Sequence, residues 1–143
     1  MMDRYVFPAV FEPNDTEEGY TVTFPDLPGC ITEGDTWEVA HRRAQDTLEG
    51  FLWGMEHDGD PVPLPTPVPK VIRPPKAILT MVEAWMPGVR DEMANKAVNK
   101  TVTLPRWLKD AADREHINVS QVLQTALKQR LGIMDGDSNS RHG

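Results

Sequence analysis

The sequence predicts an α+β fold in two parts, a β-β-β-α-β domain followed by a shorter strand-helix-helix module. Three observations predict it. The front half alternates short apolar and polar runs with turn residues, and one long helical period follows them. A proline-rich stretch, 59–75, comes next. Behind it, the segment 98–131 passes from a two-residue period to two helical periods, which is the pattern of one strand and two helices.

The first three predicted strands follow one another through short turns. Arg4–Phe11 is strand-like, and Pro8 within it indicates an edge position or a bulge because proline cannot donate to a ladder. Turn residues and a second alternating run then predict a hairpin. The remaining elements are the turn 12–19, the strand Tyr20–Phe24, the loop Pro25–Cys30 and the short strand Ile31–Glu33, which Gly34 ends.

The long helical period predicts the core helix of the front domain, from about Thr36 to His57. Asp35 is expected to cap it, with Glu38 three residues later in a capping-box arrangement. One side of this helix is apolar and the other polar, so we expect it to pack across a small sheet. The apolar stripe comprises Trp37, Ala40, Ala44, Leu48, Phe51, Leu52 and Met55.

After the helix we expect a connector, a returning strand and a hinge. The alternate prolines of 59–75 favour a stiff, extended connector; an SH3-type ligand is the alternative, and nothing beside the run supports it. Ala77–Ala84 has strand character, and the Pro87-Gly88 pair predicts a hinge. The predicted divisions are therefore a front domain 1–86, a hinge 87–97, a rear domain 98–132 and a disordered tail 133–143.

The rear domain opens with a strand, 98–104, that has one polar and one apolar face. Pro105 provides the first turn of a helix that ends near His116, and Ser120 is expected to cap a second helix. A single strand leaves its backbone groups unpaired, and so short a module cannot bury a core alone. We therefore expect a second copy to pair with it antiparallel under two-fold symmetry.

The charge of the chain is divided between the two parts. The formal net charge of −7 hides 8 basic against 17 acidic residues in 1–97, and 6 basic against 3 acidic residues in 98–131. An acidic front and a mildly basic rear indicate two partners of opposite sign, although acidity can also serve solubility alone.

The rear segment resembles the ribbon-helix-helix repressors over Val98–Leu131. A β-ribbon fits the major groove, and amide and hydroxyl side chains suit base edges, while a helix N-terminus suits a phosphate. Lys100 departs from the resemblance, because such proteins often carry an apolar residue there. The implied base contacts are Asn99, Thr101 and Thr103, and the implied phosphate contacts are Lys100, Asn118, Val119 and Ser120.

The front segment resembles the HicB antitoxin family from about Tyr5 to Ala84, through YVFPAVFE, GYTV, FPDLPGC and the GDT helix entry. The resemblance implies a partial RNase H-like fold that binds a small basic mRNA-cleaving toxin of the HicA type, in a protein that represses its own operon. Acidic surface would cover the basic, RNA-facing surface of the toxin. The candidate toxin contacts are Asp26, Arg42, Asp46 and Glu49.

Catalytic and metal-binding patterns are missing from the sequence. An RNase H site needs carboxylates around metal ions, including one in the first strand, and Tyr5–Phe11 has none. Cys30 is expected to be a small buried residue rather than a nucleophile. We therefore expect no enzyme, metal or cofactor. The four histidines, His41, His57, His116 and His142, are scattered without metal-ligand spacing.

Two other functions remain as alternatives. The first is a stand-alone ribbon-helix-helix repressor whose front domain senses a small molecule, and the second is a residual hydrolase. The chain has no apolar run long enough to span a membrane and shows no secretory signal, and its single cysteine suits a reducing compartment. The expected location is therefore the cytoplasm.

Overall fold

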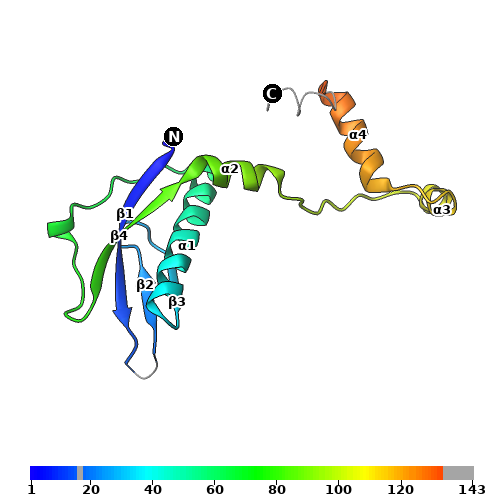
Figure 1. Ribbon diagram of the computed structural model, residues 1–143. Helices are drawn as coiled ribbons and strands as arrows, with labels where there is room; N and C mark the ends of the chain where they lie inside the picture. Colours follow the sequence, from blue (N-terminus) through cyan, green and yellow to red (C-terminus); the bar gives the residue numbers. More distant parts are fainter. Residues whose placement is uncertain (16–17, 134–143) are drawn as a thin grey trace. The chain divides into compact units, whose positions relative to one another are not determined.

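The computed structural model describes residues 1–15 and 18–133, which form two compact units with a boundary between Ala97 and Val98 (Figure 1). Unit 1 (1–97) holds a four-stranded antiparallel sheet, whereas the described part of unit 2 (98 onward) is helical. The predicted α+β class and the β-β-β-α-β order of the front part are confirmed. The elements are β1 (Arg4–Pro13), β2 (Tyr20–Thr23), β3 (Ile31–Gly34), α1 (Trp37–Asp58), η1 (Val68–Lys70), β4 (Ile78–Trp85), α2 (Met86–Asn95), α3 (Arg106–Arg114) and α4 (Val119–Leu131).

The sheet has the strand order β3-β2-β1-β4, so β1 is an inner strand. It pairs with β4 along Arg4–Phe11, but β2 reaches it only from Val10 onward. On the side of β1 that faces β4, the Met86 N–H donates to the Asp3 carbonyl at 2.7 Å. Because every second residue of an antiparallel strand bonds to the same neighbour, the odd-numbered residues of β1 bond toward β4. The nitrogen of Pro8 therefore points to the other side, where β2 has not begun, and proline costs no ladder bond there.

Helix α1 covers one face of the sheet with the predicted apolar stripe. Its residues Ala40, Ala44, Leu48 and Leu52 are buried, while Trp37, Phe51 and Met55 are partly buried against the same core. Gly34 lets β3 approach α1 closely, because a Cβ at Gly34 would lie 2.4 Å from the Ala40 nitrogen. The core of unit 1 also includes Tyr5, Phe7, Phe11, Val22, Phe24, Leu27, Cys30, Val82, Ala84 and Met86.

The predicted cap of α1 is wrong by one residue. Thr36, not Asp35, is the N-cap, and its hydroxyl accepts a hydrogen bond from the Val39 N–H at 3.1 Å. The physical reason is that β3 continues through Gly34, which pairs with Tyr20, so the helix begins one residue later.

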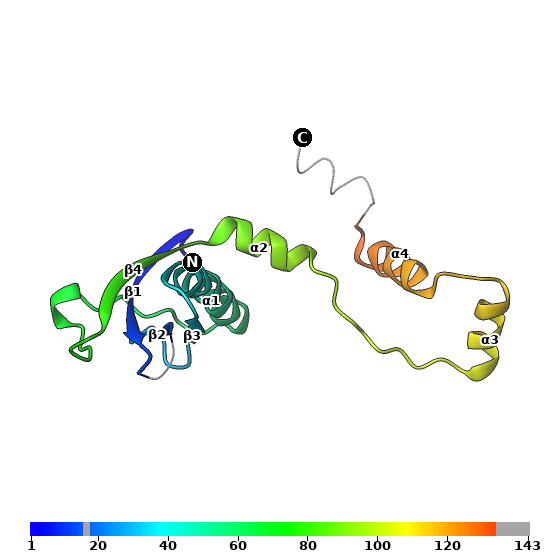
Figure 2. The same cartoon turned by 60° about the horizontal axis from the view of Figure 1, so that its bottom comes forward.

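The proline-rich connector is anchored to unit 1. Both carboxylate oxygens of Asp26 accept hydrogen bonds from Thr66, one from its N–H at 2.9 Å and one from its hydroxyl. The connector also contains η1, which lies on the opposite side of the sheet from α1 in both Figure 1 and Figure 2. The expected stiff connector is thus attached at its middle to the loop that follows β2.

The predicted hinge at 87–97 is largely helix. Pro87 lies in the first turn of α2, where its missing N–H has no partner to lose, and Met86 is fully buried. The Pro-Gly pair therefore marks the beginning of a helix that packs on α1, rather than a flexible joint.

Unit 2 consists of α3 and α4 after a segment without regular structure, 98–105. The strand expected over 98–104 is not formed in the single chain, because ladder bonds need a neighbour and no described residue provides one. The N-cap of α4 is Asn118 rather than Ser120; its side-chain oxygen accepts from the Gln121 N–H at 3.0 Å. Of the expected disordered tail, only Ile133 lies within the described residues.

Candidate functional site

Three of the four candidate toxin contacts lie together on α1. Arg42 and Asp46 are exposed and Glu49 is half-buried, all on the part of the helix that faces away from the core. Asp26 is not among them, because its carboxylate holds Thr66 of the connector. The structure therefore gives Asp26 a role inside unit 1 that its sequence context, a proline-rich loop, did not indicate.

The exposed side of α1 continues onto α2 as an acidic surface. Burial raises the pKa of Glu49, and the neighbouring carboxylates of Asp46 and Glu92 raise it further. Glu92 belongs to α2 and is exposed. Sequence reasoning missed this contribution, because the residues of α2 were expected to form a hinge. We call Asp46, Glu49 and Glu92 the acidic surface.

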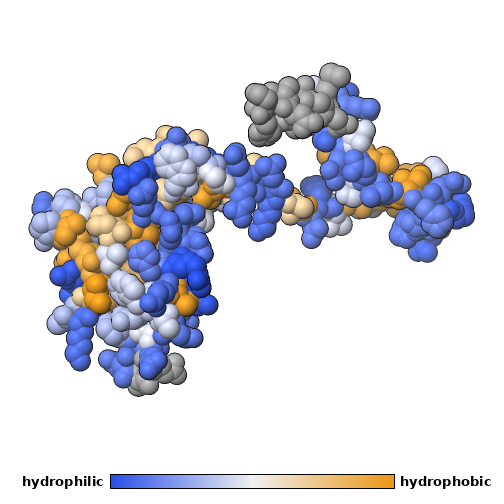
Figure 3. Space-filling model, viewed as in Figure 1, coloured by the Kyte–Doolittle hydropathy of each residue, from blue (hydrophilic) through white to orange (hydrophobic). Residues whose placement is uncertain are grey.

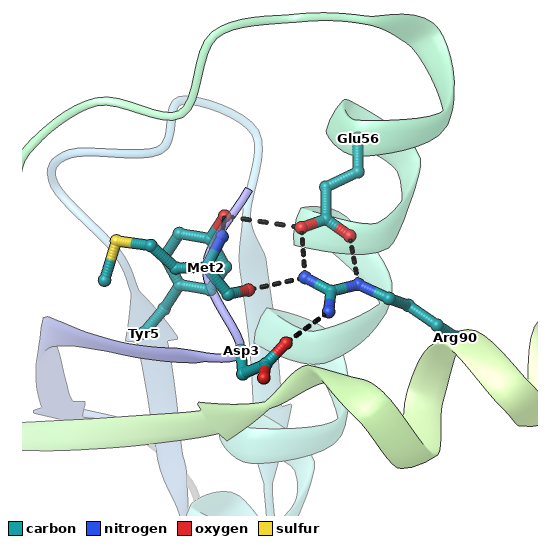
Figure 4. Close-up of polar contacts among 5 residues, drawn as sticks. All are labelled: Met2, Asp3, Tyr5, Glu56 and Arg90. Carbon is teal, nitrogen blue, oxygen red and sulfur yellow. Dashed lines mark hydrogen bonds and ion pairs between the residues drawn. The ribbon is translucent and has the colours of Figure 1, made fainter.

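A partly buried ion pair joins α2 to the rest of unit 1 (Figure 4). Arg90 donates to both oxygens of Glu56, from Nε to Oε1 at 3.0 Å and from Nη2 to Oε2 at 2.8 Å. Its Nη1 also donates to Asp3 Oδ1 at 2.8 Å, and its Nη2 to the Met2 carbonyl. The Glu56 side chain is only 8% exposed and also accepts from the Tyr5 hydroxyl at 3.3 Å.

This cluster connects three parts of the sequence: the beginning of β1, the end of α1 and the middle of α2. The hydrogen bonds that Arg90 donates to Glu56 lower the pKa of the Glu56 carboxyl. In return, the carboxylates of Glu56 and Asp3 that accept these bonds raise the pKa of Arg90. No local sequence signal could identify it, since its members are 34 and 87 residues apart. Each charged group of the cluster is hydrogen-bonded by another member, so it is a structural clamp rather than a reactive site.

A hollow of about 370 Å³ lies beside this clamp. Its lining includes Met1, Met2, Tyr5, Glu56 and Val62. The Glu56 carboxylate is already engaged by Arg90 and Tyr5, so it is not free to orient a ligand. The hollow therefore does not favour the alternative of a small-molecule sensor.

The candidate DNA contacts all lie in unit 2. Asn99, Lys100, Thr101 and Thr103 are exposed in the segment before α3. The second group, Asn118–Ser120, lies at the beginning of α4, as expected for a phosphate site, although the Asn118 side chain already caps the Gln121 N–H. A single chain does not test whether these two groups contact DNA, so their roles as base and phosphate contacts stay predictions.

The described residues contain no group of three or more His, Cys, Asp or Glu that could hold a metal ion. Cys30 is buried, and burial raises the pKa of its thiol to about 11. One detail differs from expectation: β1 extends to Pro13 and so includes the carboxylate of Glu12, which is exposed near the end of the strand. Within the described ranges, no helix is long and apolar enough to cross a bilayer.

Comparisons with known proteins identify a family. The sequence profile of a family described as HicB-like antitoxin of bacterial toxin-antitoxin systems matches residues 7–127. An uncharacterised 14.9 kDa protein of Haemophilus phage HP1 is 28% identical over 123 residues, which are 80% of this chain and 90% of that protein. Antitoxin HicB 1 of Photorhabdus laumondii is 42% identical over 62 residues, which are 43% of this chain and 39% of the antitoxin.

Solved structures support the fold. A toxin-antitoxin complex from Streptococcus pneumoniae contains a chain with a TM-score of 0.58 and 20% identity, covering 89% of this chain and 99% of that one. The antitoxin HicB of Burkholderia pseudomallei has a TM-score of 0.51 and 21% identity, covering 89% and 98%.

Proposed function

Because this chain belongs to the HicB-like antitoxin family of bacterial toxin-antitoxin systems, we propose that it binds and neutralises a HicA-type mRNA-cleaving toxin and represses its own operon. The observation that carries the proposal is the family match, which extends from β1 into α4 and so includes parts of both units. An antitoxin of this family acts by binding and is not an enzyme. The proposed place of action is the cytoplasm.

We assign toxin binding to unit 1. Residues 1–97 carry 17 acidic against 8 basic residues, and the acidic surface concentrates part of this charge on α1 and α2. A small basic toxin would meet complementary charge there, which speeds association and excludes other partners. Neutralisation is then steric and electrostatic, because the acidic unit covers the surface with which the toxin meets RNA.

Co-expression tests this proposal directly. The toxin encoded beside this chain should arrest growth when it is produced alone, and the full-length chain should restore growth. The two purified proteins should also form a complex in isothermal titration calorimetry, with an affinity that falls as salt is added. A neighbouring gene product that neither arrests growth nor binds this chain would contradict the proposal.

We assign DNA binding to a dimer of unit 2. No residue in its described part is buried, although Trp107 and Leu131 are large and apolar and are 70% and 71% exposed. Hydrophobic side chains are visible on its surface in Figure 3. Such a unit lacks a core of its own, and a second copy would provide one by packing α3 and α4 of both chains beneath a shared two-stranded ribbon.

In this arrangement Asn99, Thr101 and Thr103 contact base edges in the major groove. Lys100 and the backbone amides of Asn118, Val119 and Ser120 contact phosphates. Sedimentation equilibrium should show at least a dimer, and hydrogen exchange should show protected amides at 98–104. A monomer whose amides exchange freely there would rule out the shared ribbon.

A further inference from the structure

The outer edge of the sheet at β4 pairs with no strand among the described residues. β4 is the last strand in the order β3-β2-β1-β4 and is eight residues long (Figure 1). Its even-numbered residues bond toward β1, as the Met86 bond to Asp3 shows. The Glu83 carbonyl instead accepts from the Gln45 side chain at 3.3 Å, so the odd-numbered residues direct their backbone groups outward. These are Leu79, Met81, Glu83 and Trp85.

The sequence of β4 does not protect this edge. Proteins usually block an open edge with proline, lysine, a bulge or a very short strand. The eight residues of β4, ILTMVEAW, include no proline and no lysine, and they pair with β1 without a bulge. Met81 and Trp85 are 41% and 55% exposed. In Figure 3, hydrophobic side chains lie at the surface where Figure 1 places β1 and β4. The edge therefore offers both free backbone groups and apolar side chains.

The opposite edge differs in length. β3 has only four residues, and Arg43 of α1 donates to the Glu33 carbonyl at 3.1 Å, so Ile31 and Glu33 are its outward residues. Both edges thus have one carbonyl bonded by a side chain of α1. Only β4 has enough further outward groups to form a ladder with another strand.

The charges beside β4 indicate the kind of partner. Gln45 places this side of α1 at the edge, and Glu49, one turn later, belongs to the acidic surface. Among the cations of β1, α1 and α2, Arg4 pairs with Glu83 at 3.1 Å and Arg90 with Glu56 and Asp3, whereas Arg42 is exposed on α1. Three further exposed cations precede β4 in the chain, so the acidic character belongs to the Glu83 end of the edge: Lys70, Arg73 and Lys76. A second copy of the acidic unit 1 would meet like charge here, whereas a basic protein would meet opposite charge.

We propose that the free edge of β4 receives an extended strand of a basic partner protein, which continues the sheet while its cations face the acidic surface. The ladder would use the outward N–H and carbonyl groups of Leu79 and Met81 and the outward N–H of Glu83, whose carbonyl is bonded by Gln45. This inference rests on the proposed function, since the basic partner is the toxin, and it assigns the toxin's docking surface to β4.

A proline at the edge tests the ladder. Met81→Pro removes an outward N–H and leaves every bond to β1 in place, because proline is tolerated where its nitrogen faces solvent. Ile31→Pro does the same at the β3 edge and is the matched control. In calorimetric titrations of the full chain with the purified toxin, we expect Met81→Pro to weaken binding at least tenfold and Ile31→Pro to leave it within twofold. Thermal unfolding of both variants checks the fold.

A charge pair keeps the test decisive if the proline variant unfolds. Met81 is exposed enough to accept a charge, so Met81→Lys should weaken binding of the basic toxin in low salt, and Met81→Glu should not. If the wild type binds the toxin, and Met81→Pro, Met81→Lys and Ile31→Pro bind it with the same affinity, the β4 edge is not the docking surface, although the proposed function still stands. No wild-type binding at all would instead overturn the proposed function. Loss of self-association in Met81→Pro, with toxin binding unchanged, would assign the edge to a second copy and also overturn the inference.

Discussion

At the scale of single residues, two glycines of unit 1 have opposite surroundings. A Cβ at Gly34 would lie 2.4 Å from the backbone nitrogen and 2.6 Å from the Cα of Ala40. A Cβ at Gly50, in the middle of α1, would meet nothing within 4 Å. The first glycine is therefore needed for the close approach of β3 to α1, whereas the second only weakens the helix.

Alanine at these two positions should change stability in opposite directions. We expect Gly34→Ala to lower the free energy of unfolding by about 1–3 kcal/mol or more, because backbone atoms must separate to admit the methyl group. Gly50→Ala should raise it by roughly 0.5–1 kcal/mol, because alanine favours the helix and finds open space. Urea unfolding of the two variants measures both. Equal stability of Gly34→Ala and the wild type would contradict the close contact.

At the scale of elements, the clamp formed by Glu56, Arg90 and Asp3 fixes α2 to the rest of unit 1. The Arg90 hydrogen bonds hold the pKa of Glu56 below its ordinary value of 4.5. A carboxylate with a lowered folded-state pKa contributes stability that is present above its unfolded pKa and is lost as the pH falls through the folded pKa. The clamp is therefore at full strength near neutral pH and weakens in acid.

Arg90→Gln tests the clamp through its pH dependence. At pH 7 the variant leaves the 8% exposed Glu56 without its cation, so we expect a loss of about 1–3 kcal/mol. The difference from the wild type should shrink as the pH falls below 4.5 and through the lowered folded-state pKa of Glu56, because the carboxylate that Arg90 binds is then lost in the wild type as well. Arg4→Gln is the control, since its pair with Glu83 is well exposed and should contribute only about 0–1 kcal/mol. A difference between Arg90→Gln and the wild type that did not change with pH would argue against the clamp.

At the scale of the whole molecule, the two proposed activities belong to different units. Thr101→Ala and Thr103→Ala should each cost roughly 1–3 kcal/mol of sequence discrimination at the operator if each removes one base contact. Toxin neutralisation should be unchanged, because unit 1 (1–97) does not contain these residues. Electrophoretic mobility shifts and growth rescue measure the two activities in the same variants. If both activities fell together while the fold stayed intact, the division between the units would be wrong.

Where sequence expectations differ from the structure, the difference usually has a local cause. The caps of α1 and α4 are Thr36 and Asn118 rather than Asp35 and Ser120, because several side chains in each turn could serve as caps and the end of the preceding segment selects one. The Pro87-Gly88 pair is compatible with a hinge or with the first turn of a helix. Burial of Met86 and the bonds of Arg90 decide for the helix.

The sequence by itself determined the α+β class, the order of elements in the front domain, the buried stripe of α1 and the family, because periodicity and motifs are local and survive without coordinates. Only the tertiary structure decided that Asp26 holds the connector, that Arg90 clamps α2 to Glu56 and Asp3, and that β4 has the free edge. Each of these depends on residues that are distant in sequence, and folding alone brings such residues within hydrogen-bonding distance.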